Sequence, residues 1–409
     1  MHPAGVPGTP VGSVRPAVEV ADSVRRFGER LSASRTLSFE QRRALEHIAV
    51  CRTARLGGHL DVCPDCGQQR PAYNSCRDRH CPKCQWLRSQ RWLDSRLGRI
   101  LPVHHFHVVF TLPSELRPLV LYNRRTLYAL LFASATTALK KLGADDRRLG
   151  AELGITAVLH TWSRDLGFHP HIHCVVTGGG LDADGKWVRS RPGFLFPVRV
   201  LGKLFRGIFL QRLKRLHADG QLVCSGKCTP LASASDFQRL LDKLYRKRWN
   251  VYSKKPFGGV NGVHRYLAKY THRIAISNRR LIGFDDRAVT FYTRHNKTAS
   301  LAPLAFLARF ICHVLPGNFV RIRHFGLYAS SNVNGRLLQA RVLLQPPETP
   351  VDSGAEPHDE PEYVTRYRNA TGIDLGRCPR CGSLMYRCAL LPDPNAPAFA
   401  LSRAPPEAA

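Results

Sequence analysis

Residues 168–176 read FHPHIHCVV, a run in which three histidines alternate with other residues and apolar residues follow at once. Side chains two positions apart in a β-strand lie on the same face of a sheet. The pattern therefore predicts a strand that presents His169, His171 and His173 on one face and buries Ile172 on the other. A pair of neutral imidazoles on a rigid face suits a divalent metal ion, which needs at least one more ligand from elsewhere in the chain.

The segments around this strand predict an α+β fold built on an antiparallel sheet. β-Branched and aromatic runs favour strands, and recurring leucines favour helices. The expected strands are 105–113, 155–162, 171–179, 281–284 and 289–292, and the expected helices are 122–142, 200–217, 237–249 and one that begins near 263. Strands mixed with helices in this order are typical of an α+β domain.

Composition points to a polyanionic partner. The 409 residues contain 61 Lys and Arg against 30 Asp and Glu, a net charge of +31. Nucleic acid is the expected partner, because neutralised phosphates release counterions. We find no apolar run of about 18 residues that would span a bilayer. The first residues lack the apolar core of a signal peptide, so we expect a cytoplasmic protein without a membrane partner.

Six of the 13 cysteines fall between positions 51 and 84. Two Cys-x-x-Cys pairs there have the spacing of a four-cysteine zinc site, which would be closed and would serve docking rather than catalysis; they are Cys63, Cys66, Cys81 and Cys84. Further candidates are Cys51, His59, Cys76 and His80. If these four residues also bind metal, alternate pairs of ligands along the chain would hold two zinc ions in an interleaved arrangement. In the other interpretation Cys76 and His80 only stabilise a loop whose Arg77 and Arg79 touch DNA.

The expected domains follow from these patterns. They are a flexible arm over 1–20, a helical zinc-binding domain over 21–100, the domain of the histidine strand over 101–345, an acidic proline-rich linker over 346–363, a small cysteine-containing tail over 364–391 and a disordered end over 392–409. The sequence SFEQ at 38–41 is a capping box and predicts the start of a helix in the zinc-binding domain. In the tail, CPRCG at 378–382 is half of a metal site, with Cys388 as a candidate third ligand.

A second candidate for chemistry is the stretch HRYLAKYTHR at 264–273. On a helix Tyr266 and Tyr270 would share one face, and tyrosine can act as a covalent nucleophile. A bound metal ion would stabilise charge that develops on a phosphodiester. Positive charge for DNA binding would come from Lys255, Arg265, Lys269 and Arg273. The spacing by itself favours the alternative interpretation, a packing face of tyrosine and leucine.

Five segments together resemble the rolling-circle transposases of insertion-sequence family ninety-one. They are 73–85, 106–113, 168–181, 254–281 and 306–326. The resemblance implies a ferredoxin-like antiparallel HUH sheet, in which two histidines flank an apolar residue, preceded by a small zinc-binding domain. It implies that His171 and His173 bind Mg²⁺ or Mn²⁺ and that Tyr266 and Tyr270 are the nucleophiles. It does not fix the third metal ligand, for which Asp165, His169 and His272 are candidates.

The family's activity, as the resemblance implies it, is cleavage and rejoining of single-stranded DNA through a 5′-phosphotyrosine in rolling-circle transposition. The expected partners are single-stranded DNA, from the element ends and from the target, and the host replication machinery. The N-terminal domain is expected to bind Zn²⁺. Two alternatives remain. One is a plasmid replication initiator or relaxase with the same chemistry, and the other is a non-catalytic zinc-dependent DNA-binding regulator. The regulator predicts that both tyrosines can be replaced by phenylalanine without loss of function.

Overall fold

The computed structural model describes residues 18–84, 92, 95, 99–257, 274–344, 365, 367–369, 372–390 and 392. The chain forms two compact units. Unit 1 combines Met1–Leu87, Ile276–Ile311 and Thr349–Ala409, and unit 2 combines Arg88–Ala275 and Cys312–Glu348. This division differs from the expected single domain over 101–345, because helix α9 (Pro303–Ile311) packs against α1 (Val20–Ser34) near the N-terminus.

Unit 2 is built on one antiparallel sheet with the strand order β11-β4-β5-β3-β7, and β6 pairs with β5 at one end. In chain order β3, β4, β5 and β7 alternate with helices as β-α-β-β-α-β, which is the ferredoxin-like arrangement. The expected α+β fold with an antiparallel sheet is therefore confirmed. The strands are β3 (His105–Thr111), β4 (Glu152–Trp162), β5 (Phe168–Leu181), β6 (Trp187–Arg189), β7 (Val251–Phe257) and β11 (Ile322–Gly326).

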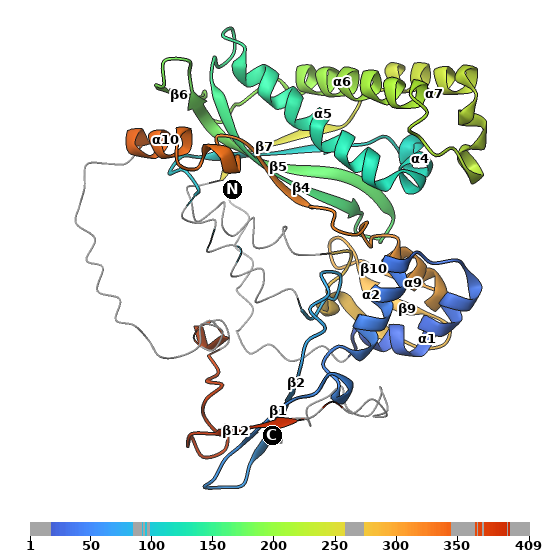
Figure 1. The fold of residues 1–409 in the computed structure, drawn as a ribbon, viewed down its shortest axis with the longest axis vertical. Helices are drawn as coiled ribbons and strands as arrows, with labels where there is room; N and C mark the ends of the chain where they lie inside the picture. Colours follow the sequence, from blue (N-terminus) through green and yellow to red (C-terminus); the bar gives the residue numbers. More distant parts are fainter. Residues whose placement is uncertain are drawn as a thin grey trace. The chain divides into compact units, whose positions relative to one another are not determined.

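One face of this sheet is covered by helices (Figure 1). The hydrophobic core lies between these helices and alternate residues of the strands, such as Phe106, Phe110, Ile172 and Val176. Among the described residues of unit 2, the helices are α4 (Arg117–Tyr122), α5 (Arg124–Ala144), α6 (Val198–Ala218), α7 (Ala234–Arg246) and α10 (Arg336–Leu344). Within the described ranges, no helix has the length and apolar character needed to cross a bilayer.

The described part of unit 1 contains two separate small sheets. The order β10-β9-β8 defines one, made of β8 (Leu281–Phe284), β9 (Val289–Tyr292) and β10 (Thr298–Leu301). Helices α1, α2 (Phe39–Val50) and α9 contact one another, and Phe27 of α1 meets Phe284 of β8 edge to face at 6.0 Å. The other sheet has the order β12-β1-β2 and joins β1 (Gly58–Val62) and β2 (Gln69–Tyr73) to the distant β12 (Tyr386–Leu390).

Most of the expected elements are present. Ser38 caps α2, and the reciprocal bonds of a capping box with Gln41 are both made. The strands expected at 281–284 and 289–292 have those bounds. Helix α7 ends at Arg246 rather than near 249, because the chain turns there so that Trp249 enters the core of unit 2. The helix expected to begin near 263 lies outside the described residues.

Candidate functional site

The face of the unit 2 sheet opposite the helices is lined with histidines. Because Ile172 and Cys174 of β5 point into the core, His171 and His173 point the other way, as the sequence predicts. Antiparallel pairing sets His160 of β4 directly opposite His171. His107 of β3 is on the same face, one diagonal step from His173. Three strands thus deliver imidazoles to one surface.

Three of these side chains form a group that we call the histidine cluster: His160, His171 and His173. Each offers one ring nitrogen, and the three nitrogens lie within 4.8 Å of one another. The ring centroid of His160 is 5.5 Å from that of His171 and 4.4 Å from that of His173, and the last two are 4.8 Å apart. Such a set of nitrogen donors can hold one metal ion.

Hydrogen bonds fix the orientation of two of the rings. His171 donates from Nδ1 to the carbonyl oxygen of His169 at 2.6 Å, which leaves Nε2 as its ligand atom. Nδ1 of His173 is 2.8 Å from Nε2 of His107, and these two rings stack 5.0 Å apart. Metal-binding histidines commonly use the second ring nitrogen in this way, because the bond fixes tautomer and ring direction.

Burial keeps His171, His173 and the neighbouring His107 neutral. Desolvation lowers the pKa of His171 to about 4. The pKa of His173 falls well below its usual 6.5, first through burial and then through the neighbouring imidazoles, His160 before His171. Burial, with a smaller contribution from Lys254, lowers the pKa of His107 to about 4. At neutral pH these rings are therefore unprotonated, which is the form that binds metal.

The hairpin between β4 and β5 positions His160. Residues 163–167 close it, with the amide of Ser163 donating to the carbonyl of Gly167 at 3.0 Å. The register shifts by one residue between His160 and Trp162, and such bulges often lie beside functional sites. Leu166 adopts a positive φ of 62° in this loop and is fully buried.

Two of the three candidate third ligands lie outside the histidine cluster. Asp165 lies in the hairpin loop, where its carboxylate accepts a hydrogen bond from Ser163, and it is outside the histidine cluster. His169 is also outside the cluster, and its Nδ1 accepts a hydrogen bond from Arg117 at 3.1 Å. His272 falls outside the described residues. Among the described residues, His160 is the one grouped with His171 and His173, because the hairpin register sets it opposite His171.

The tyrosines and most of the expected DNA-binding residues cannot be placed. Tyr266 and Tyr270 lie outside the described residues, as do Arg265, Lys269 and Arg273. Lys255 belongs to β7, and only its backbone is described. Arg77 is exposed in the cysteine loop and Arg79 is partly buried.

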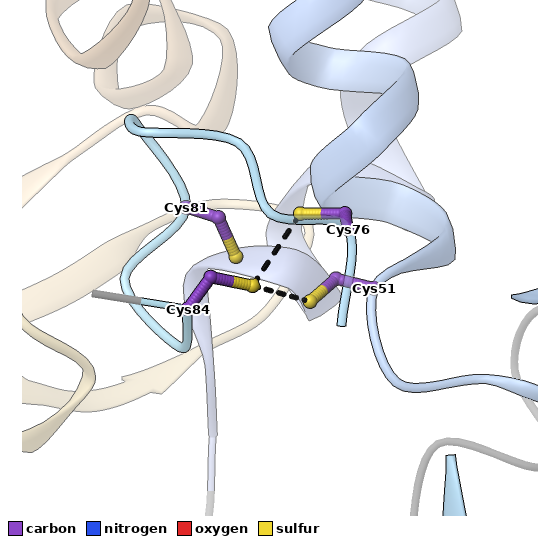
Figure 2. A group of neighbouring side chains, drawn as sticks. All are labelled: Cys51, Cys76, Cys81 and Cys84. Atoms are coloured by element: carbon purple, nitrogen blue, oxygen red, sulfur yellow. Dashed lines mark hydrogen bonds between the residues drawn. The ribbon is translucent and has the colours of Figure 1, made fainter. Parts of the chain in front are cut away.

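The first cysteine group consists of Cys51, Cys76, Cys81 and Cys84, whose sulfur atoms lie within 4.8 Å of one another (Figure 2). Cys51 is the C-cap of α2, Cys76 comes from a later loop, and the last two form a tight turn. The Cys84 sulfur is 3.3 Å from that of Cys51 and 3.5 Å from that of Cys76. Tetrahedral zinc with sulfur ligands at about 2.3 Å would separate the sulfurs by about 3.8 Å, so the group needs little rearrangement to hold one ion.

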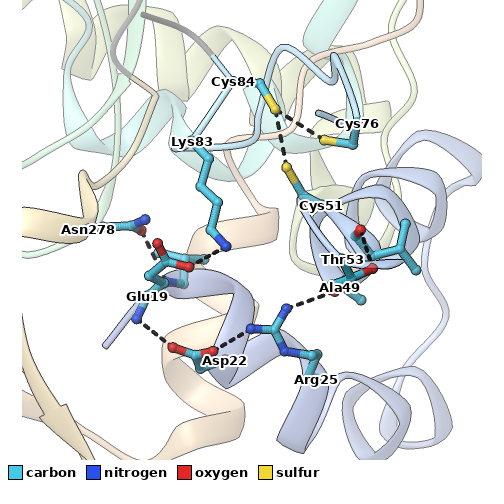
Figure 3. A network of polar contacts seen from close by, with 12 residues as sticks. Glu19, Asp22, Arg25, Ala49, Cys51, Thr53, Cys76, Lys83, Cys84 and Asn278 are labelled. Carbon is cyan, nitrogen blue, oxygen red and sulfur yellow. Dashed lines mark hydrogen bonds and ion pairs between the residues drawn. The ribbon is translucent and has the colours of Figure 1, made fainter. Parts of the chain in front are cut away.

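Polar contacts hold this group against α1 (Figure 3). Lys83, within the turn of the last two cysteines, makes an ion pair with Glu19, and both side chains are largely buried. Glu19 is the N-cap of α1, and its backbone amide donates to the carboxylate of Asp22 at 2.8 Å in a capping box. Asp22 in turn pairs with Arg25, which donates to the carbonyl oxygen of Ala49 at 2.9 Å, just before Cys51. The turn and the end of α2 are therefore fixed to the same helix.

The second cysteine group consists of Cys63, Cys66, Cys378 and Cys381. The two Cys-x-x-Cys pairs of the N-terminal region therefore belong to different groups, and the expectation that they share one zinc ion is wrong. The reason is that Cys63 and Cys66 follow β1, which pairs with β12 near the C-terminus. Cys388, the expected third ligand in the tail, is exposed and lies outside the group.

The interleaved arrangement with histidine ligands is also not formed. His80 Nδ1 is 2.9 Å from a carboxylate oxygen of Asp78, whose other oxygen is 3.1 Å from His47 Nδ1. Burial raises the pKa of Asp78, but the contacts with His80 and His47 outweigh it and lower the pKa to about 2. His59 Nε2 is 3.9 Å from Asp61. Both expected histidine ligands therefore face carboxylates outside the two cysteine groups.

A basic hollow lies in unit 2 where α6 meets the end of α7 and the start of β7. Every charged residue that lines it is basic, and Trp249 forms part of its wall; the five are Arg199, Lys203, Arg206, Arg246 and Arg248. Arg206 donates to the carbonyl oxygen of Lys247 at 2.9 Å, which fixes its guanidinium at the rim. The sequence interpretation missed this hollow, because its residues are spread over 50 positions and share no motif.

Comparisons with known proteins agree with this arrangement. A family model described as a transposase zinc-binding domain matches residues 23–112, and one described as a putative transposase matches residues 154–335. A protein named putative transposase y4qJ from Sinorhizobium fredii is 44% identical over 90% of this chain and 94% of its own length. The transposase for insertion sequence element IS801 from Pseudomonas savastanoi pv. phaseolicola is 29% identical over 84% of this chain and 82% of its own. No solved structure matches.

Proposed function

The chain belongs to the transposases of insertion-sequence family ninety-one that carry an N-terminal zinc-binding domain, and on that premise we propose that it cleaves and rejoins single-stranded DNA with tyrosine nucleophiles beside a metal ion in the histidine cluster. The observation that carries this proposal is the convergence of three imidazoles, two of them kept neutral by burial, on the face of the sheet opposite the helices. A transposase acts on DNA, and a divalent ion on such a face is suited to a phosphodiester.

The donor set fits a divalent cation. His160, His171 and His173 each offer a ring nitrogen at mutual distances that one ion can bridge. Nitrogen donors suit Mn²⁺ better than Mg²⁺, whose preferred ligands are oxygens. A cation bound there would polarise a non-bridging oxygen of the scissile phosphate. The bond between His171 Nδ1 and the His169 carbonyl and the contact between His173 and His107 would hold two of the ligands in position.

We assign the nucleophiles to Tyr266 and Tyr270. A phenolic oxygen would form a bond to phosphorus while the bond from phosphorus to the 3′ oxygen breaks. The phenol loses its proton, and the departing oxygen becomes a 3′-hydroxyl that host enzymes would extend. Rejoining is the reverse attack by a 3′-hydroxyl on the phosphotyrosine. Two tyrosines four positions apart fit an exchange in which one holds the element end while the other acts at the target.

DNA binding would use the zinc-binding domain and the basic surfaces. The first cysteine group is a closed set of four thiols, which suits a structural zinc ion rather than a catalytic one. The exposed Arg77 projects from the loop that this group stabilises. The basic hollow of unit 2 offers further contacts to phosphates.

The test is a search for a covalent adduct between the full-length chain and single-stranded oligonucleotides that carry an element end, in Mn²⁺. Mass spectrometry of the digested product should find a phosphotyrosine peptide at Tyr266 or Tyr270. Replacement of both tyrosines by phenylalanine should abolish the adduct, whereas Tyr252→Phe should retain it. Tyr252 is a suitable control because it is 51% exposed and lies on β7 of the same sheet. If the double variant forms the adduct as well as the native chain, or if the native chain forms no adduct in Mn²⁺ or in Mg²⁺, the non-catalytic regulator is favoured instead.

A further inference from the structure

The second cysteine group joins parts of the chain that are far apart in sequence. Cys63 Sγ is 3.4 Å from Cys381 Sγ across a separation of 318 positions, and Cys66 Sγ is 3.6 Å from Cys378 Sγ across 312 positions. Cys66 and Cys381 are 3.5 Å apart. These distances are far longer than the roughly 2.05 Å of a disulfide, and all four thiols are free.

The two halves of this group have the same local structure. Residues 63–67 read CPDCG and residues 378–382 read CPRCG. In each, the glycine amide donates to the carbonyl of the first cysteine, at 3.0 Å for Gly67 and 2.9 Å for Gly382. Both glycines have a positive φ, 70° and 78°, which side chains rarely adopt. In contrast, the turn at Cys81–Cys84 has glutamine in the fifth position. The turns at 63–67 and 378–382 therefore match each other in local structure, and neither matches the turn at Cys81–Cys84.

Contacts outside the cysteines hold the two halves together. Strand β12 pairs with β1 over five residues in antiparallel register, from Gly58 with Leu390 to Val62 with Tyr386. Asp61 of β1 is buried and receives Arg387 at 2.9 Å and Arg70 at 3.1 Å. Arg70 also donates to the carbonyl oxygen of Leu375. The sheet thus sets the four sulfurs side by side at the end of β1.

We propose that the second cysteine group binds a structural zinc ion of its own and thereby fastens the C-terminal segment 372–390 to β1. Four thiols from two Cys-x-x-Cys turns are the ligand set of closed tetrahedral zinc sites. The sulfur separations lie close to the roughly 3.8 Å that a tetrahedral ion requires. Because the ligands come from both ends of the sequence, the ion closes a loop that contains all of unit 2. A metal link across a long loop removes conformational freedom from the unfolded chain.

The zinc content of the full-length chain tests the stoichiometry. With the histidine cluster disabled by His171→Ala and His173→Ala in every protein tested, the chain purified in zinc and dialysed against metal-free buffer should contain two zinc ions by mass spectrometry of the metal. Cys378→Ser with Cys381→Ser should contain one, and Cys76→Ser with Cys84→Ser should also contain one. Cys388→Ser should retain two, because Cys388 is an exposed cysteine of the same segment outside the group. Two ions in the first double variant would overturn the proposal, as would only one in the chain with all its cysteines.

Alkylation of the cysteines tests the pairing directly and does not depend on activity. In the native zinc protein all eight grouped cysteines should resist N-ethylmaleimide, while Cys388 reacts. In the variant with Cys378→Ser and Cys381→Ser, Cys63 and Cys66 should react with N-ethylmaleimide at least tenfold faster than in the native chain. The first cysteine group should stay protected in that variant, which shows that the N-terminal domain remains folded. If Cys63 and Cys66 stay as protected as in the native chain, the C-terminal turn is not their partner and the proposal fails.

Discussion

His160 and His171 stand directly opposite each other on β4 and β5, with their ring centroids 5.5 Å apart. They are joined by a hairpin loop of five residues, 163–167, that is closed by its own backbone hydrogen bonds. The whole histidine cluster therefore comes from one hairpin, since His173 is two residues further along β5. Its geometry does not depend on a distant segment of the chain, so the cluster should form whenever the sheet forms.

Replacing His160 should impair metal binding as severely as replacing His171. We expect His160→Ala to weaken Mn²⁺ binding by more than about 100-fold, because loss of a ligand should exceed the 10–100-fold effect of losing a supporting hydrogen bond. DNA cleavage should fall in parallel. Mn²⁺ affinity can be measured by calorimetry or by electron paramagnetic resonance of the free ion.

His324→Gln is the matched control for this experiment. His324 lies on β11 of the same sheet, where its Nδ1 is 3.0 Å from the Thr156 hydroxyl, and it is outside the cluster. Its replacement should leave Mn²⁺ affinity within a factor of about three of the native value. Equal affinity of His160→Ala and the native chain would exclude His160 as a ligand.

The sequence predicted part of this site. The part that it did not predict depends on how the strands pair, which the local pattern of residues does not specify. Alternation within β5 is a local property, so the shared face of His171 and His173 and the burial of Ile172 followed from the residues alone. The partner strand was also expected, as ITAVLHTW at 155–162. What was missing was the register, which depends on the loop and on the bulge near His160. Counting back from the pair Trp162 and Phe168 would have set His160 opposite Pro170, and only the bulge moves it opposite His171.

The cysteine groups show a different limit. Spacing predicted metal binding by the cysteines, but proximity in sequence suggested the wrong pairing of the turns. Spatial pairing is decided by β12, which adds to β1 from more than 300 positions away. The glycine that follows Cys66 and Cys381 but not Cys84 was the available signal, because it requires the same turn in both halves. Long-range pairing of this kind leaves little trace in local patterns.

His107 should act as a positioning residue for His173. Its Nε2 lies 2.8 Å from His173 Nδ1. We expect His107→Phe to weaken Mn²⁺ binding by about 10–100-fold, a smaller loss than removal of a ligand. His107→Gln, whose amide can still meet His173 Nδ1, should recover most of the affinity. Equal losses in both variants would indicate that His107 matters through packing rather than through this contact.

The basic hollow should contribute to DNA affinity through phosphates and not through bases. Replacing Arg199 and Lys203 together by alanine should weaken binding to single-stranded oligonucleotides of any sequence. The slope of log affinity against log salt should fall by about 0.7 for each phosphate that the variant no longer neutralises. Lys214→Ala removes an exposed charge from the same helix α6 outside the hollow and should leave the slope unchanged. Fluorescence anisotropy at several salt concentrations measures both quantities. An unchanged slope in the double variant would place the DNA elsewhere.

His105 should make the stability of unit 2 depend on pH. It is fully buried, and its Nδ1 is 2.9 Å from the carbonyl of Val103 while its Nε2 is 2.7 Å from the hydroxyl of Tyr328. The Tyr328 oxygen also accepts the amide of Leu101 at 3.1 Å. In this chain of bonds His105 donates from Nδ1 and accepts at Nε2, so only the neutral ring satisfies every partner. Burial lowers its pKa to about 4.

The sign of the effect follows from where the two states bind the proton. The unfolded chain protonates His105 near its usual pKa of 6.5, and the folded chain only near 4. Between these values the unfolded state holds more protons, so the free energy of unfolding falls as pH falls. The contribution is complete above pH 6.5, and about 3 kcal/mol is lost by pH 4.

Urea denaturation between pH 7.5 and 5, followed by tryptophan fluorescence with zinc present, measures this slope. His105→Asn can keep the donor to Val103 but does not titrate. We expect the free energy of unfolding of the variant to be lower at pH 7.5. Its slope against pH should be smaller than in the native chain by at most about 1.4 kcal/mol per pH unit, which corresponds to one proton. Other buried histidines, such as His313, will keep a residual slope, since burial lowers the pKa of that ring to about 4 as well. His295→Asn, at an exposed loop position in unit 1, serves as the control. A slope in His105→Asn equal to that of the native chain would show that His105 is protonated without cost in the folded state.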